Sequence, residues 1–126
     1  MSRFLQIHHA SVIVAELAAA LHFYTEVLGL EVDGSRPSMA FNGAWLTVAS
    51  QQIHLLELPN PDPIEGRPEH AGRDRHIALL VEDLNDIEAR LQQEAVAFTR
   101  SRSGRNAIFC RDPDGNGIEL IEVLRS

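Results

Sequence analysis

The chain has 126 residues, of which 44% are hydrophobic and 23% are charged, and its formal net charge is −7. This length and composition are typical of one globular domain and exclude disordered and collagen-like classes. The negative charge disfavours nucleic acid as a partner, and the absence of lysine excludes Schiff-base and P-loop chemistry.

The first half of the chain predicts one strand, one helix and three further strands. Residues 5–14 are rich in β-branched and apolar side chains, as a strand requires. Residues 16–28 place apolar side chains at helical spacing, and Gly29 follows them as a typical helix stop. Three shorter strands are predicted at residues 31–36, 44–49 and 52–58.

The second half is predicted to repeat this order after a linker. Residues 59–74 contain four prolines and two glycines, which is typical of a linker or flap. A strand at residues 75–81 and a helix at 83–94 follow. The last three strands are predicted at residues 96–102, 105–111 and 117–123, and Asp-Pro-Asp-Gly-Asn at 112–116 has the composition of a tight hairpin turn.

An internal repeat accounts for the likeness of the two halves. The stretch HASVIV, which begins at His9, matches HIALLV, which begins at His76, and residues 53–58 match residues 118–123 at nearly the same offset. Two matches in the same order indicate a duplication. We therefore predict a single α+β domain, residues 1–126, of two tandem βαβββ modules. The modules cover about residues 4–58 and 75–124, and their sheets form a concave cleft.

The matching points of the repeat carry a candidate set of metal ligands. His9 corresponds to His76 on the first strand of each module, and His54 corresponds to Glu119 on the last. Three imidazoles and one carboxylate suit zinc, iron, nickel, cobalt or manganese. If the two modules lie side by side, the repeat symmetry brings all four side chains to the floor of the cleft.

Glu119 provides the strongest local argument for a metal. Strand alternation places it on one face with Ile121 and Val123, while the other face is also apolar. A carboxylate buried in that strand needs a metal, a proton or a cation as compensation. His54 lies in the same way on a face with Leu56 and Leu58.

Two motifs lie near the two ends of the sequence. The opening motif consists of His9, Val14, Leu17, Phe23-Tyr24 and Leu28-Gly29-Leu30, and the closing motif consists of residues 112–116 with Glu119-Leu120. Both motifs resemble those of the glyoxalase/bleomycin-resistance/dioxygenase proteins, the vicinal oxygen chelate superfamily. The resemblance covers nearly the whole chain and implies paired βαβββ modules with a divalent metal in the concave sheet. It also implies that His9, His76 and Glu119 are metal ligands.

Position 54 departs from the glyoxalase I pattern, in which a glutamate or glutamine is expected. Three-ligand relatives such as extradiol dioxygenases use no ligand at this position. His54 therefore either binds the metal or only faces the substrate. The absence of lysine also disfavours a fosfomycin-resistance activity.

Arg105 is the candidate substrate-binding residue. It lies among four arginines between positions 100 and 111 of an otherwise acidic chain. One interpretation is that Arg105 binds a substrate carboxylate or phosphate at the mouth of the cleft. The alternative is a solvated hairpin edge, where charges prevent aggregation.

Other chemically distinctive residues are expected to have structural roles. Cys110 is predicted to be a buried, inert thiol, and Glu57 and Glu122 are predicted to be solvated at strand ends. No functional role is assigned to the remaining histidines, and the aromatic side chains are expected in the core. These residues are His8, His22, His70, Tyr24, Phe41, Trp45, Phe98 and Phe109.

The leading hypothesis is a divalent-metal enzyme that acts on a small substrate with vicinal oxygens, with Glu119 or a metal-bound water transferring the proton. Isomerase or lyase chemistry is the first choice and Fe(II) dioxygenase chemistry the second. With Glu119 as the only carboxylate, the site should favour an anionic substrate. The alternative is a metal-free module that binds a small molecule or drug, as bleomycin-resistance members of the superfamily do.

The expected setting is a cytoplasmic homodimer. No apolar run reaches the roughly 18 residues of a membrane span, and the N-terminus does not have the pattern of a signal peptide. The single cysteine cannot form an internal disulfide, which fits a reducing compartment. A symmetric dimer is expected because it is the commonest oligomer and because the proteins that this chain resembles pair modules across chains.

Overall fold

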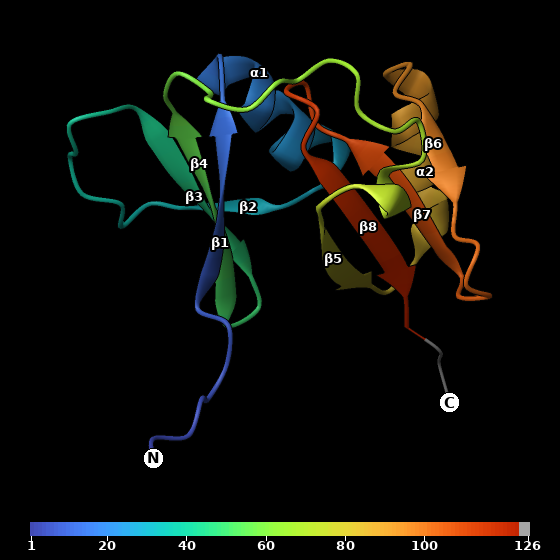
Figure 1. Ribbon diagram of the computed structural model, residues 1–126, viewed down its shortest axis with the longest axis horizontal. Coiled ribbons are helices and arrows are strands. Elements are labelled where there is room, and N and C mark those ends of the chain that lie inside the picture. The colour runs from blue at the N-terminus through green and yellow to red at the C-terminus, as the bar shows by residue number, and fades with distance from the viewer. Residues whose placement is uncertain (124–126) are drawn as a thin grey trace.

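The computed structural model describes residues 1–123 as two βαβββ modules (Figure 1). The strands of the first module are β1 (His9–Val14), β2 (Glu31–Asp33), β3 (Gly43–Val48) and β4 (Gln51–Glu57). The strands of the second are β5 (His76–Val81), β6 (Phe98–Arg100), β7 (Ala107–Arg111) and β8 (Gly117–Glu122). The helical segments are α1 (Leu17–Leu21), η1 (His22–Val27), η2 (Ala71–Arg73) and α2 (Leu84–Gln93).

Each module forms a mixed four-stranded sheet with the same topology. The strand orders are β1-β4-β3-β2 and β5-β8-β7-β6. In both sheets the first and last strands of the module are parallel, and the remaining pairs are antiparallel. This confirms the predicted α+β fold of two repeated modules. None of the helices in residues 1–123 is long and apolar enough to cross a membrane.

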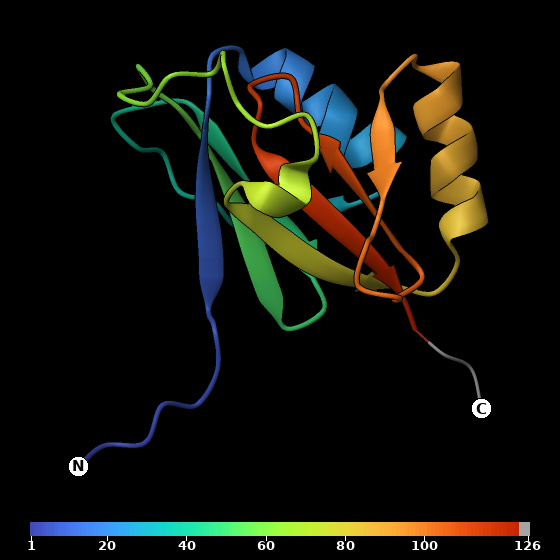
Figure 2. The same cartoon turned by 45° about the vertical axis from the view of Figure 1, so that its right-hand side comes forward.

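The first strand is shorter than predicted. The prediction placed it at residues 5–14, but β1 begins at His9. The Gln52 amide donates to the His8 carbonyl oxygen at 3.2 Å, and β4 begins only one residue earlier. Residues 1–7 therefore have no neighbouring strand and project away from both sheets (Figures 1 and 2).

The first helix also differs, because it changes pitch in the middle. The predicted helix at residues 16–28 is α-helical only as far as Leu21 and continues as a π-helix, η1. The Thr25 hydroxyl donates to the Leu21 carbonyl oxygen at 2.6 Å. In an α-helix that oxygen accepts from the Thr25 amide, so the hydroxyl is an additional donor at the point where the pitch changes.

One hydrophobic core is shared by the two modules. In the first module α1 packs against β3 and β4, in the second α2 packs against β8, and η1 contacts α2 (Figure 2). Burial alternates along β5, whereas β7 and β8 each have four consecutive buried residues and are therefore covered on both faces. The fully buried large side chains of the core are Tyr24, Leu46, Ile53, Leu55, Leu84, Leu91, Ile108, Ile118 and Leu120.

The turn between β7 and β8 joins the second module to the first. The predicted hairpin turn at residues 112–116 is present, but its carboxylates also reach the other module. Asp112 is 4% exposed and accepts a hydrogen bond from the Tyr24 hydroxyl at 2.7 Å. Asp114 accepts from the Ala15 amide at 2.9 Å, and the Asn116 side chain donates to the Ile13 carbonyl at 3.2 Å. This turn therefore sets how the two modules sit in one chain.

Two glutamates at strand ends cap the helices instead of being solvated, which corrects the prediction. Glu57 accepts from the Leu17 amide at 2.7 Å, and Glu122 accepts from the Leu84 amide at 3.0 Å. The Leu17 amide lowers the pKa of Glu57. Sequence periodicity could not show this, because the capping residue is far from the helix along the chain. The two caps are equivalent positions of the repeat.

We expect Glu122→Ala to lower the free energy of unfolding by about 1–2 kcal/mol, the usual cost of losing a helix cap. The substitution leaves the Leu84 amide without its acceptor and also removes the acceptor of the Asn106 side chain. Urea denaturation measures the effect. Glu82→Ala is the matched control, since Glu82 is an exposed glutamate at the same end of α2. Equal stability of the two variants would contradict the capping role.

Candidate functional site

The first half of the candidate site lies on the sheet of module 1. His9 of β1 and His54 of β4 stack face to face, with ring centroids 3.9 Å apart and an interplanar angle of 12°. Trp45 of β3, which lies opposite His54 in the register, stacks on the other side of His54 at 4.7 Å. The sequence prediction placed Trp45 in the core, but it lies on the histidine face of the sheet.

Hydrogen bonds fix the orientation of the His54 ring. His54 Nε2 lies 2.8 Å from Gln52 Oε1, and the Gln52 amide nitrogen donates to Asp33 at 2.6 Å. This arrangement makes Nε2 the donor and leaves Nδ1 without a proton. Burial lowers the pKa of His54, and the neighbouring His9 and His8 lower it further. His54 is therefore a neutral imidazole at neutral pH, the form that binds metals.

The second half of the site lies on the sheet of module 2. His76 Nε2 of β5 is 3.2 Å from Glu119 Oε1 of β8. His76 Nδ1 is 2.9 Å from the Asp74 carbonyl oxygen, which orients the ring with Nε2 toward the glutamate. Glu119 is only 5% exposed, as predicted for this strand. Phe109 of β7 lies opposite Glu119 in the register and contacts the His76 ring edge-on.

The two halves are equivalent in strand register. His9 is opposite Gln52, two residues before His54. His76 is opposite Gly117, two residues before Glu119. The duplication deduced from the sequence therefore extends to the placement of the four candidate ligands.

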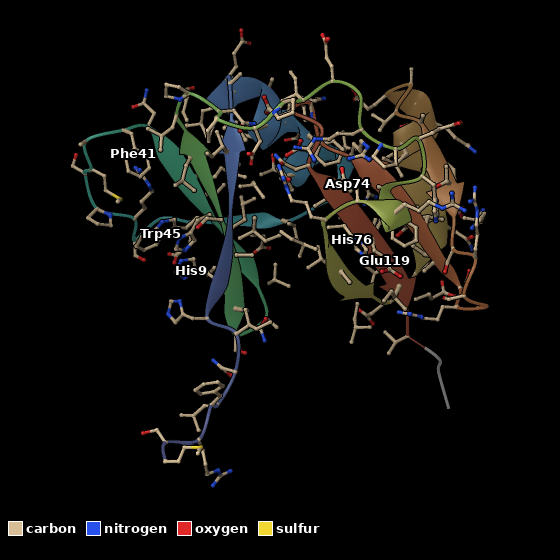
Figure 3. All side chains as sticks on the ribbon, viewed as in Figure 1. His9, Phe41, Trp45, Asp74, His76 and Glu119 are labelled. Atoms are coloured by element: carbon tan, nitrogen blue, oxygen red, sulfur yellow. The ribbon has the colours of Figure 1, made fainter. Side chains whose placement is uncertain are left out.

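Within one chain, however, the two pairs do not meet. Figure 3 shows His9 on one sheet, with His76 and Glu119 apart from it on the other. Within residues 1–123, no group of three or more His, Cys, Asp or Glu side chains is placed to hold a metal ion. A cavity of about 270 Å³ does lie between β1 and β5, but among the four candidate ligands only His76 lines it.

Arg105 lies near the second pair. Its guanidinium is 3.7 Å from Glu119 Oε2, and both residues line a cavity of about 380 Å³. His70 lines the same cavity, although the sequence assigned it no function. Its position in a proline-rich linker gave no periodic signal that could have placed it there.

Cys110 takes no part in this chemistry. It is buried on the opposite face of β7, and burial raises the pKa of its thiol to about 12. A thiol with that pKa is not ionised at neutral pH and is a poor nucleophile or ligand.

Comparisons with known proteins agree with this fold. Residues 6–120 match the family described as Glyoxalase/Bleomycin resistance protein/Dioxygenase superfamily. The chain is 29% identical over 119 residues to "Glyoxylase I 4" of Arabidopsis thaliana, covering 90% of this chain and 68% of that protein.

Two solved structures share the fold over 98% of this chain and 100% of their own. A candidate glyoxalase family protein from Bacillus anthracis superposes with a TM-score of 0.74 at 23% identity. TnmS3, an antibiotic binding protein from Streptomyces sp. CB03234, superposes with a TM-score of 0.69 at 22% identity. At these identities the similarity establishes the fold alone.

Proposed function

Because the chain belongs to the glyoxalase/bleomycin resistance protein/dioxygenase superfamily, we propose that it is a divalent-metal-dependent enzyme. Its substrate is a small molecule with vicinal oxygens. The observation that carries the proposal is the equivalent register of two donor pairs, His9 with His54 and His76 with Glu119. Isomerase or lyase chemistry is the first choice, and Fe(II) dioxygenase chemistry is the second.

The donor geometry of the second pair fits a metal. Ligands about 2.0–2.2 Å from one ion lie roughly 3–3.5 Å from each other. The distance of 3.2 Å between His76 Nε2 and Glu119 Oε1 is in this range. The bond from His76 Nδ1 to the Asp74 carbonyl is also the usual outer partner of a metal-bound histidine. His76 and Glu119 would hold the ion, together with His9 and with His54 if its free Nδ1 binds.

We propose that the site is completed across a symmetric dimer. His9 and His54 of one subunit then face His76 and Glu119 of the other, and the two-fold axis produces two equivalent sites. The separation of the pairs within one chain supports this arrangement. So does Leu80, which is 69% exposed and shares a strand face with His76. An apolar side chain on that face is suited to burial in a subunit interface.

The side chains around Glu119 suggest which group performs each part of the reaction. When bound, the metal would act as a Lewis acid on the vicinal oxygens of the substrate. Glu119 Oε1 faces His76, whereas Oε2 faces Arg105 and the cavity. Oε2 is therefore the atom that would accept a substrate proton and return it. Arg105 would bind an anionic group of the substrate.

We expect the wild-type protein to bind about one divalent ion per chain, because a two-fold dimer would carry two sites. We expect His76→Ala to weaken metal binding by more than about 100-fold. Loss of a residue that only hydrogen-bonds to a metal ligand already lowers metal affinity by about 10–100-fold. Elemental analysis after loading with zinc, nickel, cobalt, manganese or iron(II) measures both. His22→Ala is the control, because His22 is on η1 and pairs with Glu94.

Two results would contradict the proposal. One is a wild-type protein that retains no metal after loading. The other is a His76→Ala variant with wild-type affinity. The same titration on His54→Ala separates the two roles left open for His54. If His54→Ala lowers the metal affinity as much as His9→Ala does, His54 is a ligand. If metal content is normal but substrate binding is weaker, His54 is a pocket residue.

The second candidate is a metal-free binding module. The exposed stack of His9, His54 and Trp45 supports it, since flat rings can bind a planar ligand without metal. It is distinguished from the enzyme by the same metal analysis. A metal-free protein that binds small aromatic molecules would favour this second candidate.

A further inference from the structure

The cavity beside Glu119 is open to solvent, and most of its lining comes from residues other than the four candidate ligands. It has a volume of about 380 Å³. Its walls come from the hairpin between β6 and β7, at residues 101–105, and from the end of the linker, at residues 70–73. Glu119 and His76 form the side nearest the proposed metal. A substrate held by those two residues would extend into this cavity.

Three arginines line the cavity: Arg73, Arg102 and Arg105. In the part of the chain that the structure describes, Arg73 and Arg102 form no ion pair, and Arg105 pairs only with Glu119. The arginines that instead pair with carboxylates elsewhere are Arg67, Arg75, Arg100 and Arg111. In a chain of net charge −7, this cavity therefore concentrates uncompensated positive charge.

His70 adds a buried polar group to the same cavity. It is 9% exposed, and its Nδ1 is 2.6 Å from the Thr99 hydroxyl. A Cβ atom at Gly72 would lie 2.7 Å from His70 Nε2, so glycine is needed for this placement. Burial lowers the pKa of His70, and the nearby guanidiniums of Arg102 and Arg73 lower it further. The effect of Arg102 and Arg73 on His70 shows that both guanidiniums are close to this wall of the cavity, where their positive charge favours an anion.

We propose that this cavity binds a phosphate dianion carried by the substrate. The inference rests on the proposed function, because Glu119 belongs to both the metal set and the cavity wall. Glu119 offsets one of the three arginine charges, so a singly charged carboxylate would offset only one of the remaining two, whereas a dianion offsets both. A dianion with three terminal oxygens matches several guanidinium forks at once. The substrate class is therefore a small phosphomonoester with vicinal oxygens.

Calorimetric titration of metal-free protein with monomethyl phosphate tests this subsite. We expect Arg102→Gln to weaken binding by at least about tenfold, from the loss of charge-assisted hydrogen bonds. Arg100→Gln is the matched control. It removes the same charge only two residues from Arg102, but Arg100 pairs with Glu88 and does not line the cavity. It should change the affinity less than about twofold. Arg73→Gln provides a second variant if Arg102→Gln does not fold.

The other probes distinguish the ligand chemistry. Acetate should bind at least about tenfold more weakly than monomethyl phosphate, since it carries half the charge. Inorganic phosphate binding as tightly as monomethyl phosphate supports recognition of the dianion itself. Equal affinities for acetate and monomethyl phosphate would overturn the proposal, as would equal effects of Arg102→Gln and Arg100→Gln. The phosphate titration uses metal-free protein, so it is independent of the metal analysis. If phosphate does not bind but the protein binds metal normally, only the subsite is rejected. Phosphate binding without any metal binding rejects only the enzyme proposal.

Discussion

Co-expression of two inactive variants, His9→Ala and Glu119→Ala, is expected to restore about a quarter of the wild-type metal sites and turnover, as two-fold pairing of random subunits requires. Each variant alone should be inactive, because every site in its homodimer lacks one ligand. In the mixed dimer, one site combines both defects. The other combines the intact His9 of one subunit with the intact Glu119 of its partner. Half of the dimers are mixed, and half of their sites are intact.

The matched control is a mixture of His76→Ala and Glu119→Ala. Both residues belong to the second module, so every site of that mixed dimer remains defective. Metal content and turnover of the unfractionated mixture measure the restored quarter. Mixed dimers isolated through two different affinity tags should have half of their sites intact. Restoration in the first mixture but not in the second would support a site shared between subunits. No restoration in either mixture, or a concentration-independent monomer in sedimentation, would refute it.

Asp112→Ala is expected to have the largest effect on stability, a loss of about 3–5 kcal/mol. The Asp112 carboxylate is buried and accepts from the amides of Asp114 and Asn116, both at 2.9 Å. It also accepts from the Asn116 side chain at 2.9 Å and from the Tyr24 hydroxyl at 2.7 Å. Alanine removes the shared acceptor of these donors from a buried position, and only the Asn116 side chain keeps another partner, the Ile13 carbonyl.

Urea denaturation gives the free energy of unfolding for this variant and for two graded variants. Asp112→Asn keeps one acceptor oxygen and should lose less than Asp112→Ala. Tyr24→Phe removes only one hydrogen bond and should cost about 1–2 kcal/mol. A loss below about 1 kcal/mol in Asp112→Ala, at an unchanged denaturant slope, would show that the turn does not join the modules as described.

The repeat is the part of the structure that could be predicted from the sequence. Strand and helix periods are local properties, so the histidines at positions 9 and 76 could be aligned before the fold was known. The same alternation predicted that Glu119 is buried and that His54 shares a face with Leu56. Family membership followed from the same residues and was confirmed by the match over residues 6–120.

Long-range contacts could not be predicted in this way. The helix caps at Glu57 and Glu122 join residues far apart in the sequence. From the strand pattern alone, both glutamates were predicted to be exposed to solvent. Trp45 was placed in the core because aromatic strand residues usually lie there, but its position opposite His54 puts it on the histidine face. Helical spacing also did not reveal the π-helix, within which the Thr25 hydroxyl donates to the Leu21 carbonyl oxygen.

The sequence by itself therefore determined the two modules, their order and the four positions at which donors recur. Only the tertiary structure decided that His9 and His54 form one pair, that His76 and Glu119 form another, and that one chain keeps the two pairs apart. The physical reason is that periodicity defines which face of a strand a side chain occupies. The distance between two such faces depends on how the modules pack, which the buried Tyr24–Asp112 contact and the shared core determine.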